Sequence, residues 1–383
     1  MVHLKRTAIA VAIALFCLGW TRPAFAADVI TMGPITLRPI ARAFIDAGLI
    51  QDDERTTANA RLTTFRLGGA GSIGGPDGIE YFVLWELRDL FGNPRPEARL
   101  RYALVHVEID KHSYVEVGQN DQPFALEGMA TTKMMSFMEF GLPLALVPLY
   151  HLGAVVTRHH DNWGAAFGVF SGTPGQRFHD SGKGWSGRAF ASPIKDGPNL
   201  LHVGLSYGER DPDGTIYRLF LRPETFIFDH PLVDTGLISD VRALKPLGLE
   251  AAWVRGPLSL QGEFVHLNMT RDAPAENLGF DGGYIYIAYS LTGEQRPFDS
   301  GRGGFASIRP SGKTAVEILA RVSWLDLDDK TIRGGKEVNF TAGLNWYLNP
   351  HARMMFNVIA ADSKRGGRER NLLVGQARLQ LDW

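Results

Sequence analysis

The chain has 383 residues, with 40 lysines and arginines against 41 aspartates and glutamates, and one cysteine. This near-neutral balance excludes the strongly basic composition of a nucleic-acid-binding protein. Because the cysteine lies at position 17, inside a segment that we expect to be removed, disulfides do not stabilise the rest of the chain.

Residues 1–26 have the pattern of a secretory signal peptide. Two basic residues precede an apolar run over 8–20, and Ala24-Phe25-Ala26 is a small-residue cleavage motif. We therefore expect cleavage after Ala26, export from the cytoplasm and one mature domain over residues 27–383. A membrane anchor is the alternative, but the apolar run is short for a helix that spans a bilayer.

After residue 26 the dominant pattern is an alternation of apolar and polar residues, which predicts strands with one apolar and one polar face. In the last segment Leu379, Leu381 and Trp383 alternate with polar residues. The best helical periodicity is at 127–140. The candidate strands lie near 35–48, 60–71, 79–88, 98–109, 112–118, 150–157, 163–171, 184–191, 198–208, 214–223, 244–254, 257–268, 280–291, 313–325, 336–347, 351–361 and 371–383.

An apolar face on many strands fits either a soluble β-sandwich or an outer-membrane barrel with lipid outside and a polar lumen. Aromatic residues at strand ends and a short turn at Asn349-Pro350 favour the barrel, as do longer connections at 224–244 and 292–312, which we interpret as outer loops. A single-chain bacterial barrel has an even number of strands. At least one candidate strand is therefore wrong, and 112–118 and 184–191 are the least certain.

The chain ends on an aromatic residue in an alternating strand. A closed sheet has no edge, so the last strand of a barrel pairs with the first. The sequence therefore predicts an all-β, transmembrane antiparallel barrel of about 16 strands in the outer membrane of a Gram-negative bacterium, in contact with its lipid.

Four stretches resemble the phosphate-selective porin O and P family, in the same order along the chain. They are VGQNDQPFALEGMATTKMMSFMEFGLP at 117–143, RDPDGTIYRLFLRPET at 210–225, LGLEAAWVRGPLSLQGEFVHL followed by LTGEQRPFD, and RVSWLDLDD followed by IRGGKEVNFTAGLNWYLNPHARMMFNV. The resemblance runs from about Arg42 to Trp383. It implies a homotrimeric 16-stranded porin that passes anions, with a constriction loop inside the barrel near 119–148.

The resemblance also indicates which basic residues would guide anions. The matching or nearby positions are Arg42, Arg66, Lys133, Arg218, Arg222 and Arg242. Arginine offers several planar donors to phosphate, whereas lysine offers a point charge. The alternative is that these residues only solvate a charged lumen wall.

Three positions depart from the basic family pattern. Thr63 and Thr64 stand where many members have consecutive arginines, and Asp121 stands where many have lysine. We therefore predict passive diffusion of small hydrophilic solutes, with at most a weak preference for anions or phosphate.

The sequence offers little support for catalysis, a cofactor or a metal site. GAGSIG at 69–74 fits a nucleotide-binding glycine pattern, but a strand and not a helix follows it. His159 and His160 are adjacent, so a strand would direct them to opposite faces. A phospholipase-like barrel enzyme and a non-channel scaffold or adhesin are the alternative functions.

Overall fold

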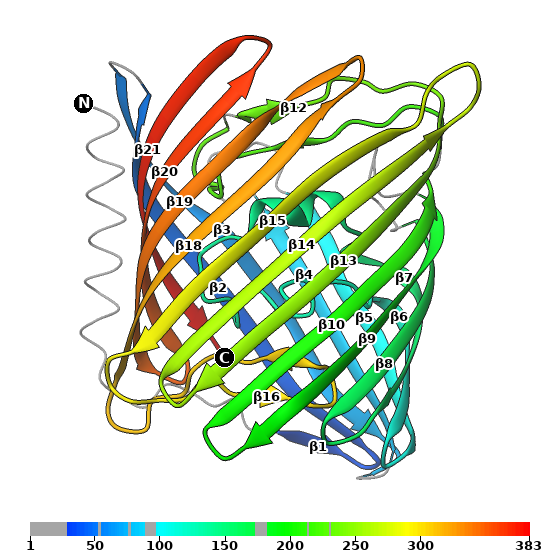
Figure 1. Cartoon of the computed structure of the whole chain (residues 1–383). Helices are drawn as coiled ribbons and strands as arrows, with labels where there is room; N and C mark the ends of the chain where they lie inside the picture. Colours follow the sequence, from blue (N-terminus) through cyan, green and yellow to red (C-terminus); the bar gives the residue numbers. More distant parts are fainter. Residues whose placement is uncertain are drawn as a thin grey trace.

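The computed structural model describes residues 29–52, 55–75, 78–88, 97–172, 182–212, 214–229 and 231–383. The expected signal peptide and Cys17 lie outside these residues. Among the described residues, one sheet contains 17 strands, each antiparallel to its neighbours (Figure 1). Apart from β1, which pairs only with β2, the other 16 strands close into a barrel.

The strands of the barrel sheet follow the chain around the wall. Their bounds are β1 Ile30–Met32, β2 Ile35–Asp52, β3 Arg55–Ile73, β4 Ile79–Arg88, β5 Glu97–Asp110, β6 Ser113–Asp121, β7 Tyr150–His159, β8 Trp163–Ser171, β9 Lys183–Asp196, β10 Asn199–Asp211, β13 Val241–Arg255, β14 Leu258–Arg271, β15 Leu278–Ser290, β18 Ala315–Asp329, β19 Ile332–Asn349, β20 Ala352–Arg365 and β21 Arg368–Asp382.

The last strand closes the barrel, as the sequence predicts. β21 pairs with β2 over eleven residue pairs, from Arg42 opposite Asp382 to Asp52 opposite Leu372. The backbones of Ala41 and Trp383 add two reciprocal hydrogen bonds of 3.0 and 2.8 Å. The terminal aromatic residue therefore lies at the seam, where its backbone satisfies what would otherwise be a free strand edge.

Alternation sorts the side chains between the lumen and the outer surface. On β14, Ser259, Gln261 and Glu263 are buried on the inner side, while Phe264 is exposed on the outside. The outer surface carries many exposed large apolar side chains, among them Leu249, Ile285, Ile287, Phe340, Val358 and Leu373. An apolar outside around a polar inside is the arrangement of a barrel in lipid. No helix in the described part of the chain is long and apolar enough to cross a membrane.

Sixteen of the candidate strands are strands of the barrel, including the doubtful 112–118 and 184–191, which belong to β6 and β9. The strand predicted at 214–223 is wrong. Only Phe220–Leu221 (β11) is extended there, and it pairs with Val233–Asp234 (β12) and not with the barrel. Its apolar side faces a core inside the lumen, where Leu219 is 5% exposed, so the alternation does not reflect a lipid-facing strand.

The two long connections lie at opposite ends of the barrel. The described residues of 212–240, which we call the outer segment, follow β10 at one end. Residues 291–314, the periplasmic segment, follow β15 at the end that holds the 350–351 turn and the C terminus (Figure 1). Short turns of bacterial barrels face the periplasm. The expectation that 292–312 is an outer loop is therefore wrong.

Residues 122–149, which we call the internal loop, fold into the lumen between β6 and β7. The helical periodicity at 127–140 is misleading, because those residues form turns and the one helical turn is a 3-10 helix, η1, at Leu142–Leu146. Wall side chains accept hydrogen bonds from loop amides: Glu263 accepts from Glu127 N, and Ser323 accepts from Leu142 N. These bonds replace the backbone ladder of a helix.

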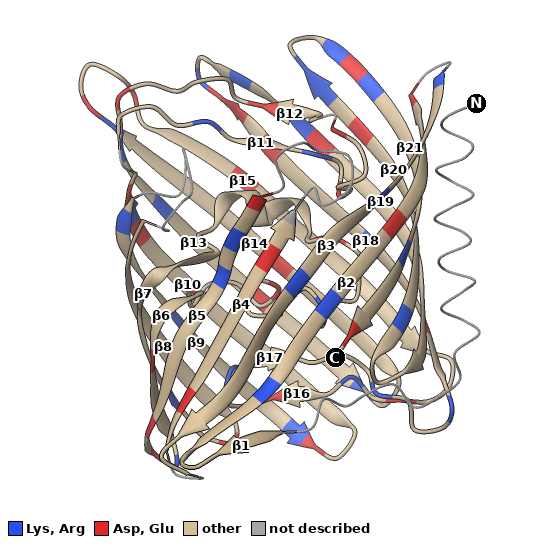
Figure 2. Ribbon diagram, turned by 180° about the vertical axis from the view of Figure 1, so that it is seen from behind, with Lys and Arg blue, Asp and Glu red and all other residues tan. Residues whose placement is uncertain are grey.

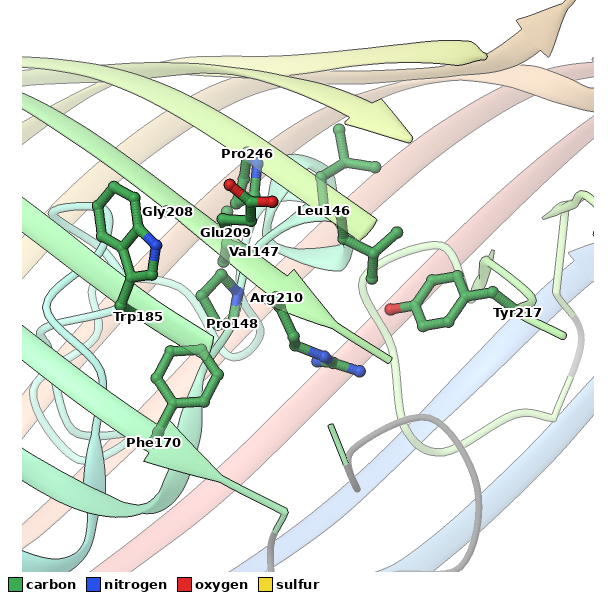
Figure 3. Close-up of a pocket in the computed structure, with 11 residues that line it drawn as sticks. Leu146, Val147, Pro148, Phe170, Trp185, Gly208, Glu209, Arg210, Tyr217 and Pro246 are labelled. Carbon is green, nitrogen blue, oxygen red and sulfur yellow. The ribbon is translucent and has the colours of Figure 1, made fainter. Parts of the chain in front are cut away.

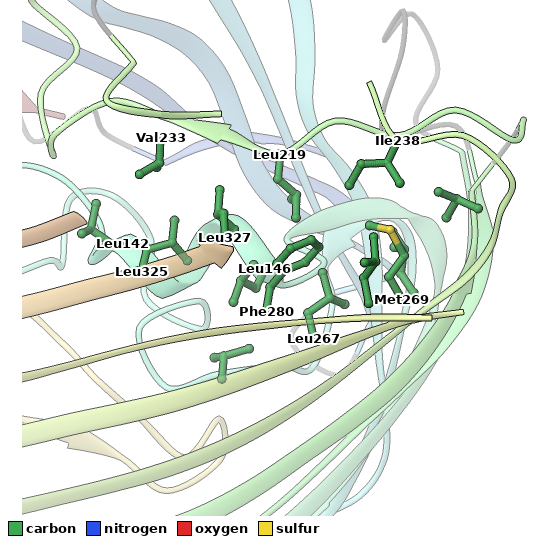
Figure 4. Close-up of a cluster of buried hydrophobic side chains, with 14 residues drawn as sticks. Leu142, Leu146, Leu219, Val233, Ile238, Leu267, Met269, Phe280, Leu325 and Leu327 are labelled. Atoms are coloured by element: carbon green, nitrogen blue, oxygen red, sulfur yellow. The ribbon is translucent and has the colours of Figure 1, made fainter. Parts of the chain in front are cut away.

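The internal loop and the outer segment share an apolar core inside the barrel. Leu142 and Leu146 of η1 meet Leu219, Val233 and Ile238 of the outer segment (Figure 4). The strands that face them contribute Val241, Leu244, Val265, Leu267, Met269, Leu278, Phe280, Leu325 and Leu327. One side of the lumen is therefore filled by packed side chains.

Candidate pore constriction

Four charged residues form a row across neighbouring strands of the inner wall. Arg42 on β2 is the register partner of Asp382 on one side and of Arg66 on the other, and Arg66 is the partner of Glu86 on β4. Arg42 Nε lies 2.9 Å from Asp382, and Arg66 Nη2 lies 2.8 Å from Glu86. We call the inner faces of β2–β6 the charged wall; these strands form the near side of the barrel in Figure 2, and their inner faces point away from the viewer.

The internal loop faces this row with Thr132 and Lys133. Lys133 Nζ donates to Asp382 at 2.7 Å, and Arg66 Nη1 donates to the Thr132 hydroxyl at 2.9 Å. Arg42, Arg66 and Lys133, which were predicted from the sequence as anion-guiding residues, therefore lie together where the loop approaches the wall. We therefore take the gap between this loop and the charged wall as the candidate constriction, where charged side chains would act on a passing ion.

Arg101 on β5 belongs to the same site, and the sequence reasoning missed it. Its guanidinium stacks on Tyr150, 3.7 Å from the ring centroid, and its buried Nε has no hydrogen-bond partner among the described residues. Arg101 and Arg42 both repel Arg66 electrostatically. A register shift at Leu84 of β4 disturbs the alternation here, so simple periodicity does not direct Arg101 into the lumen.

The positions that depart from the family pattern have specific partners. The Thr63 hydroxyl donates to Asp46 at 2.7 Å, and Asp46 also accepts from Arg378 at 2.7 Å. Asp121 accepts hydrogen bonds of 3.0 and 2.9 Å from the Tyr102 hydroxyl. Asp121 thus adds a carboxylate beside the basic row, where a lysine would have added a cation.

The other three predicted residues lie towards the outer end of the barrel. Arg218 binds Asp234 through two bonds of 2.7 and 2.6 Å, and this hydrogen bonding lowers the pKa of Asp234. Arg222 forms an ion pair with Asp229. Arg242 is exposed beside a register shift at the start of β13 and lines a surface hollow. None of the three contacts the row of the charged wall.

The inner faces of β9, β10, β13–β15 and β18–β21, which we call the packed wall, also carry arginines. Their donors bind backbone carbonyls of the segments inside the barrel. Arg378 reaches Met138 O at 2.5 Å, and Arg188 reaches Gly303 O at 2.6 Å. Arg321 binds Glu139 O, and Arg353 binds Met135 O and Lys133 O. These arginines hold the segments in place.

A hollow of about 470 Å³ opens below the constriction, on the periplasmic side of the charged wall. Arg38, Glu80, His106 and Glu116 line it, together with Arg302 of the periplasmic segment. Arg302 lies 3.1 Å from Glu116, and His106 lies 3.4 Å from the same carboxylate. The route to the periplasm therefore alternates positive and negative groups.

A narrow crevice of about 20 Å³ separates the end of the internal loop from the packed wall (Figure 3). Leu146, Val147 and Pro148 line one side of it. Arg210 extends from β10 towards Tyr217, with its guanidinium 5.8 Å from the ring centroid. The crevice is too small for a solute.

The adjacent histidines of the sequence lie at the periplasmic rim. His160 stacks on His112, with ring centroids 4.1 Å apart, and on Trp163 at 4.7 Å. In the described part of the chain, no three His, Cys, Asp or Glu side chains come together as a metal site requires.

Comparison of the sequence with known proteins identifies its family. Residues 44–383 match the family described as phosphate-selective porin O and P. Porin O of Pseudomonas aeruginosa is 24% identical over 292 residues, which are 66% of this chain and 65% of that protein. An uncharacterised protein of Caulobacter vibrioides is 27% identical over 388 residues, covering 92% of this chain and 75% of that one.

Solved structures share the fold at low identity. OmpT, an outer-membrane protein of Vibrio cholerae, aligns with a TM-score of 0.58 at 10% identity, over 93% of this chain and all of that one. An anion-selective porin from Comamonas acidovorans aligns with a TM-score of 0.57 at 13% identity, over 91% of this chain and all of that one. The chain belongs to the phosphate-selective porin O and P family and is an outer-membrane porin.

Proposed function

We propose that the protein lets small hydrophilic solutes diffuse across the outer membrane, with a weak preference for anions. The charge balance at the constriction supports this proposal. Four cationic side chains, Arg42, Arg66, Arg101 and Lys133, stand against the carboxylates of Glu86, Asp121 and Asp382. Selectivity in a pore follows its size and the charges at its narrowest point. One surplus positive charge favours anions only slightly.

A dedicated phosphate site would need several free donors that converge on one point. Here two donors of Arg66 bind Glu86 and one binds Thr132, while Arg42 and Lys133 both donate to Asp382. The family is named for phosphate selectivity, and the Comamonas porin of the same fold is anion-selective, which supports anion passage in the relatives. In this chain Arg101 is the guanidinium that we assign to transient contact with a passing anion.

We assign Arg218, Arg222 and Arg242 a lesser role. Their position at the outer end suits the attraction of anions towards the mouth, but Arg218 and Arg222 are already paired with aspartates. Substitution of Arg218 should therefore change selectivity less than substitution of Arg101.

The working form that we propose is a homotrimer of residues 27–383, after removal of residues 1–26. One crystallised form of Vibrio cholerae OmpT is described as a trimer. On β2 of this chain the outward residues Ala41, Ala43 and Ala47, together with Ile45 and Leu49, form an apolar face against which another subunit could pack. Cross-linking in detergent, read on a gel before and after heating, tests the assembly.

The test of the function is the reversal potential across a planar bilayer under a potassium chloride gradient, followed by titration with phosphate. We expect a small anion-selective potential and weak block by phosphate. A strong potential with block at micromolar phosphate would contradict the weak preference. A protein that does not conduct would instead be the scaffold or adhesin, or the phospholipase-like enzyme, which hydrolysis of a phospholipid substrate would reveal.

A further inference from the structure

Glu263 on β14 holds the start of the internal loop through its backbone. The carboxylate is 5% exposed and points into the barrel. Its two oxygens accept hydrogen bonds from consecutive amides, 2.8 Å from Leu126 N and 2.6 Å from Glu127 N. Both oxygens are therefore occupied by the loop.

Two consecutive amides that converge on one carboxylate form a small anion-binding nest. The amides of this stretch lie outside any helix or strand, so the Glu263 oxygens satisfy donors that would otherwise be buried without a partner. Glu263 is thus the acceptor for two consecutive loop amides, next to Ser206, whose hydroxyl accepts from Ala125 N at 3.3 Å.

The same carboxylate is linked to the periplasmic segment. The Tyr284 hydroxyl donates to Glu263 at 2.5 Å, and Gln261 Nε2 donates to the Tyr284 hydroxyl at 2.6 Å. Arg296 of the periplasmic segment donates to Gln261 Oε1 at 2.8 Å. This hydrogen-bond chain joins the two segments that enter the lumen from the two ends of the barrel.

The neighbouring carboxylate on β13 provides a contrast. Glu250 is the register partner of Glu263 and is equally buried. It pairs with Arg188, whose Nη2 lies 2.6 Å away, and with His202 at 2.7 Å. Among the described residues, Glu263 forms no ion pair with lysine or arginine, so amide and hydroxyl donors hold it.

We propose that Glu263 is the positioning residue that fixes the internal loop at the constriction and so sets the aperture. This inference rests on the proposed diffusion function, since the aperture matters only if solutes pass. Without the Glu263 carboxyl group as acceptor, the loop leaves the wall at residues 126 and 127. Thr132, which follows shortly after, then shifts relative to Arg66, while Arg353 still holds the carbonyls of Lys133 and Met135.

The test uses the full chain in planar bilayers with the variants Glu263→Ala, Glu263→Gln, Tyr284→Phe and Glu250→Gln. We expect Glu263→Ala to raise single-channel conductance roughly two-fold and to add current noise, because the lumen cross-section governs conductance. Glu263→Gln should behave similarly, since its amide group sets a donor against the loop amides. Tyr284→Phe keeps the carboxylate and should have a smaller effect.

Addition of formate to Glu263→Ala distinguishes loss of the carboxyl group from a general loss of packing. Millimolar formate should restore the lower conductance and the quiet current of Glu263→Ala, because it can occupy the vacated space. It should not restore Glu263→Gln, whose side chain still fills that space. The wild-type protein and Glu250→Gln show what formate does to the current by itself.

Unchanged conductance of Glu263→Ala, or a change that formate does not reverse, would overturn the proposal. Heat-modifiable migration on a gel shows whether each barrel is folded. If Glu263→Ala does not assemble, the conductance of Tyr284→Phe, which removes one hydrogen bond to Glu263, is compared with that of the wild-type protein. Absence of conductance in the wild-type protein would refute the diffusion function instead, so the two failures are distinguishable.

Discussion

The charged wall and the packed wall both carry inward arginines, but they use them differently. On the packed wall Arg321, Arg353 and Arg378 donate to carbonyls of the internal loop. On the charged wall Arg42 donates to Asp382 of the adjoining strand β21, Arg66 donates to Glu86 of β4, and Arg101 stacks on Tyr150. An arginine that faces the lumen is therefore not automatically a contact for a solute.

The difference follows from what each wall faces. Apolar clusters and the loop backbone cover the packed wall, so its buried guanidinium groups must find protein acceptors. On the charged wall, Arg38, Glu80, His106 and Glu116 line the hollow, where water and passing ions can complete the contacts. Arg42 and Arg66 are each 4% exposed and face the edge of the internal loop. The arginines of the packed wall should therefore govern stability and aperture, and those of the charged wall should govern ion selectivity.

The largest effect is expected from Arg321→Ala. Arg321 Nη2 lies 2.7 Å from Glu224 of the outer segment, with both side chains 1% exposed, and its other donors reach the internal loop. Removing one partner of a buried pair costs roughly 3–5 kcal/mol. Urea unfolding in detergent should show this loss, together with a higher channel conductance.

Arg99→Ala is the control for Arg321→Ala. Arg99 pairs with Glu97 at 2.6 Å, but both side chains are largely exposed. Such a pair contributes roughly 0–1 kcal/mol. Equal losses of unfolding free energy in the two variants would show that Arg321, which holds the internal loop and the outer segment, contributes no more than an exposed ion pair.

The next effect concerns the charged wall. Glu86→Gln frees Arg66 and should make the reversal potential more anion-selective, whereas Arg66→Gln should move it towards cations. Two charges 4 Å apart in water interact by about 1 kcal/mol, roughly a five-fold change in relative ion occupancy. Shifts of the same sign in both variants would show that Arg66 and Glu86 act on the loop and not on the ion.

Sequence alone predicted the wall of the barrel well, because lipid outside and water inside impose a period of two on every strand. Sixteen strands, the seam and the internal loop are confirmed. The strand predicted at 214–223 shows the limit. A segment packed against a core inside the lumen shows the same alternation as one that faces lipid, and only the tertiary structure separates them.

The site was less predictable for a related reason. Arg42, Arg66 and Lys133 could be placed by family resemblance, but Arg101 sits at an irregular register that the pattern does not reveal. Which inward arginines the internal loop would engage depends on contacts more than a hundred residues apart, such as Arg378 with Met138. Spacing along the sequence carries no signal for such contacts.

A smaller gain should come from restoring the family's basic pattern on the charged wall. Asp121→Lys replaces a carboxylate beside the constriction with a cation, and Thr63→Arg adds a further one. We expect tighter block by phosphate in the double variant, measured by titration of the single-channel current, with Arg99→Lys as a charge-neutral control. Unaltered block would mean that Thr63 and Asp121, which replace basic residues of the family pattern, do not explain the weak preference for anions.

The smallest effect that we expect is a rise in current noise when a fall in pH protonates Glu294 of the periplasmic segment. Glu294 accepts hydrogen bonds from Ser290 at 2.7 Å and from Ser311 at 2.8 Å, so it ties together the two ends of the segment. Although burial acts in the opposite direction, bonds from Thr292, Ser290 and Ser311 lower the pKa of Glu294 to about 2.

A carboxyl whose pKa is lowered by folding stabilises the folded state above its unfolded pKa of about 4.5, and this contribution disappears as the pH falls towards 2. Between these values the wild-type channel should become noisier as the segment loosens, while Glu294→Gln should show this noise already at neutral pH and change little on acidification. Equal responses of the two proteins would show that the acid sensitivity arises elsewhere. Because Glu294 lies outside both walls, its effect should leave the reversal potential nearly constant, which separates loosening of the segment from a change in the charges that select the ion.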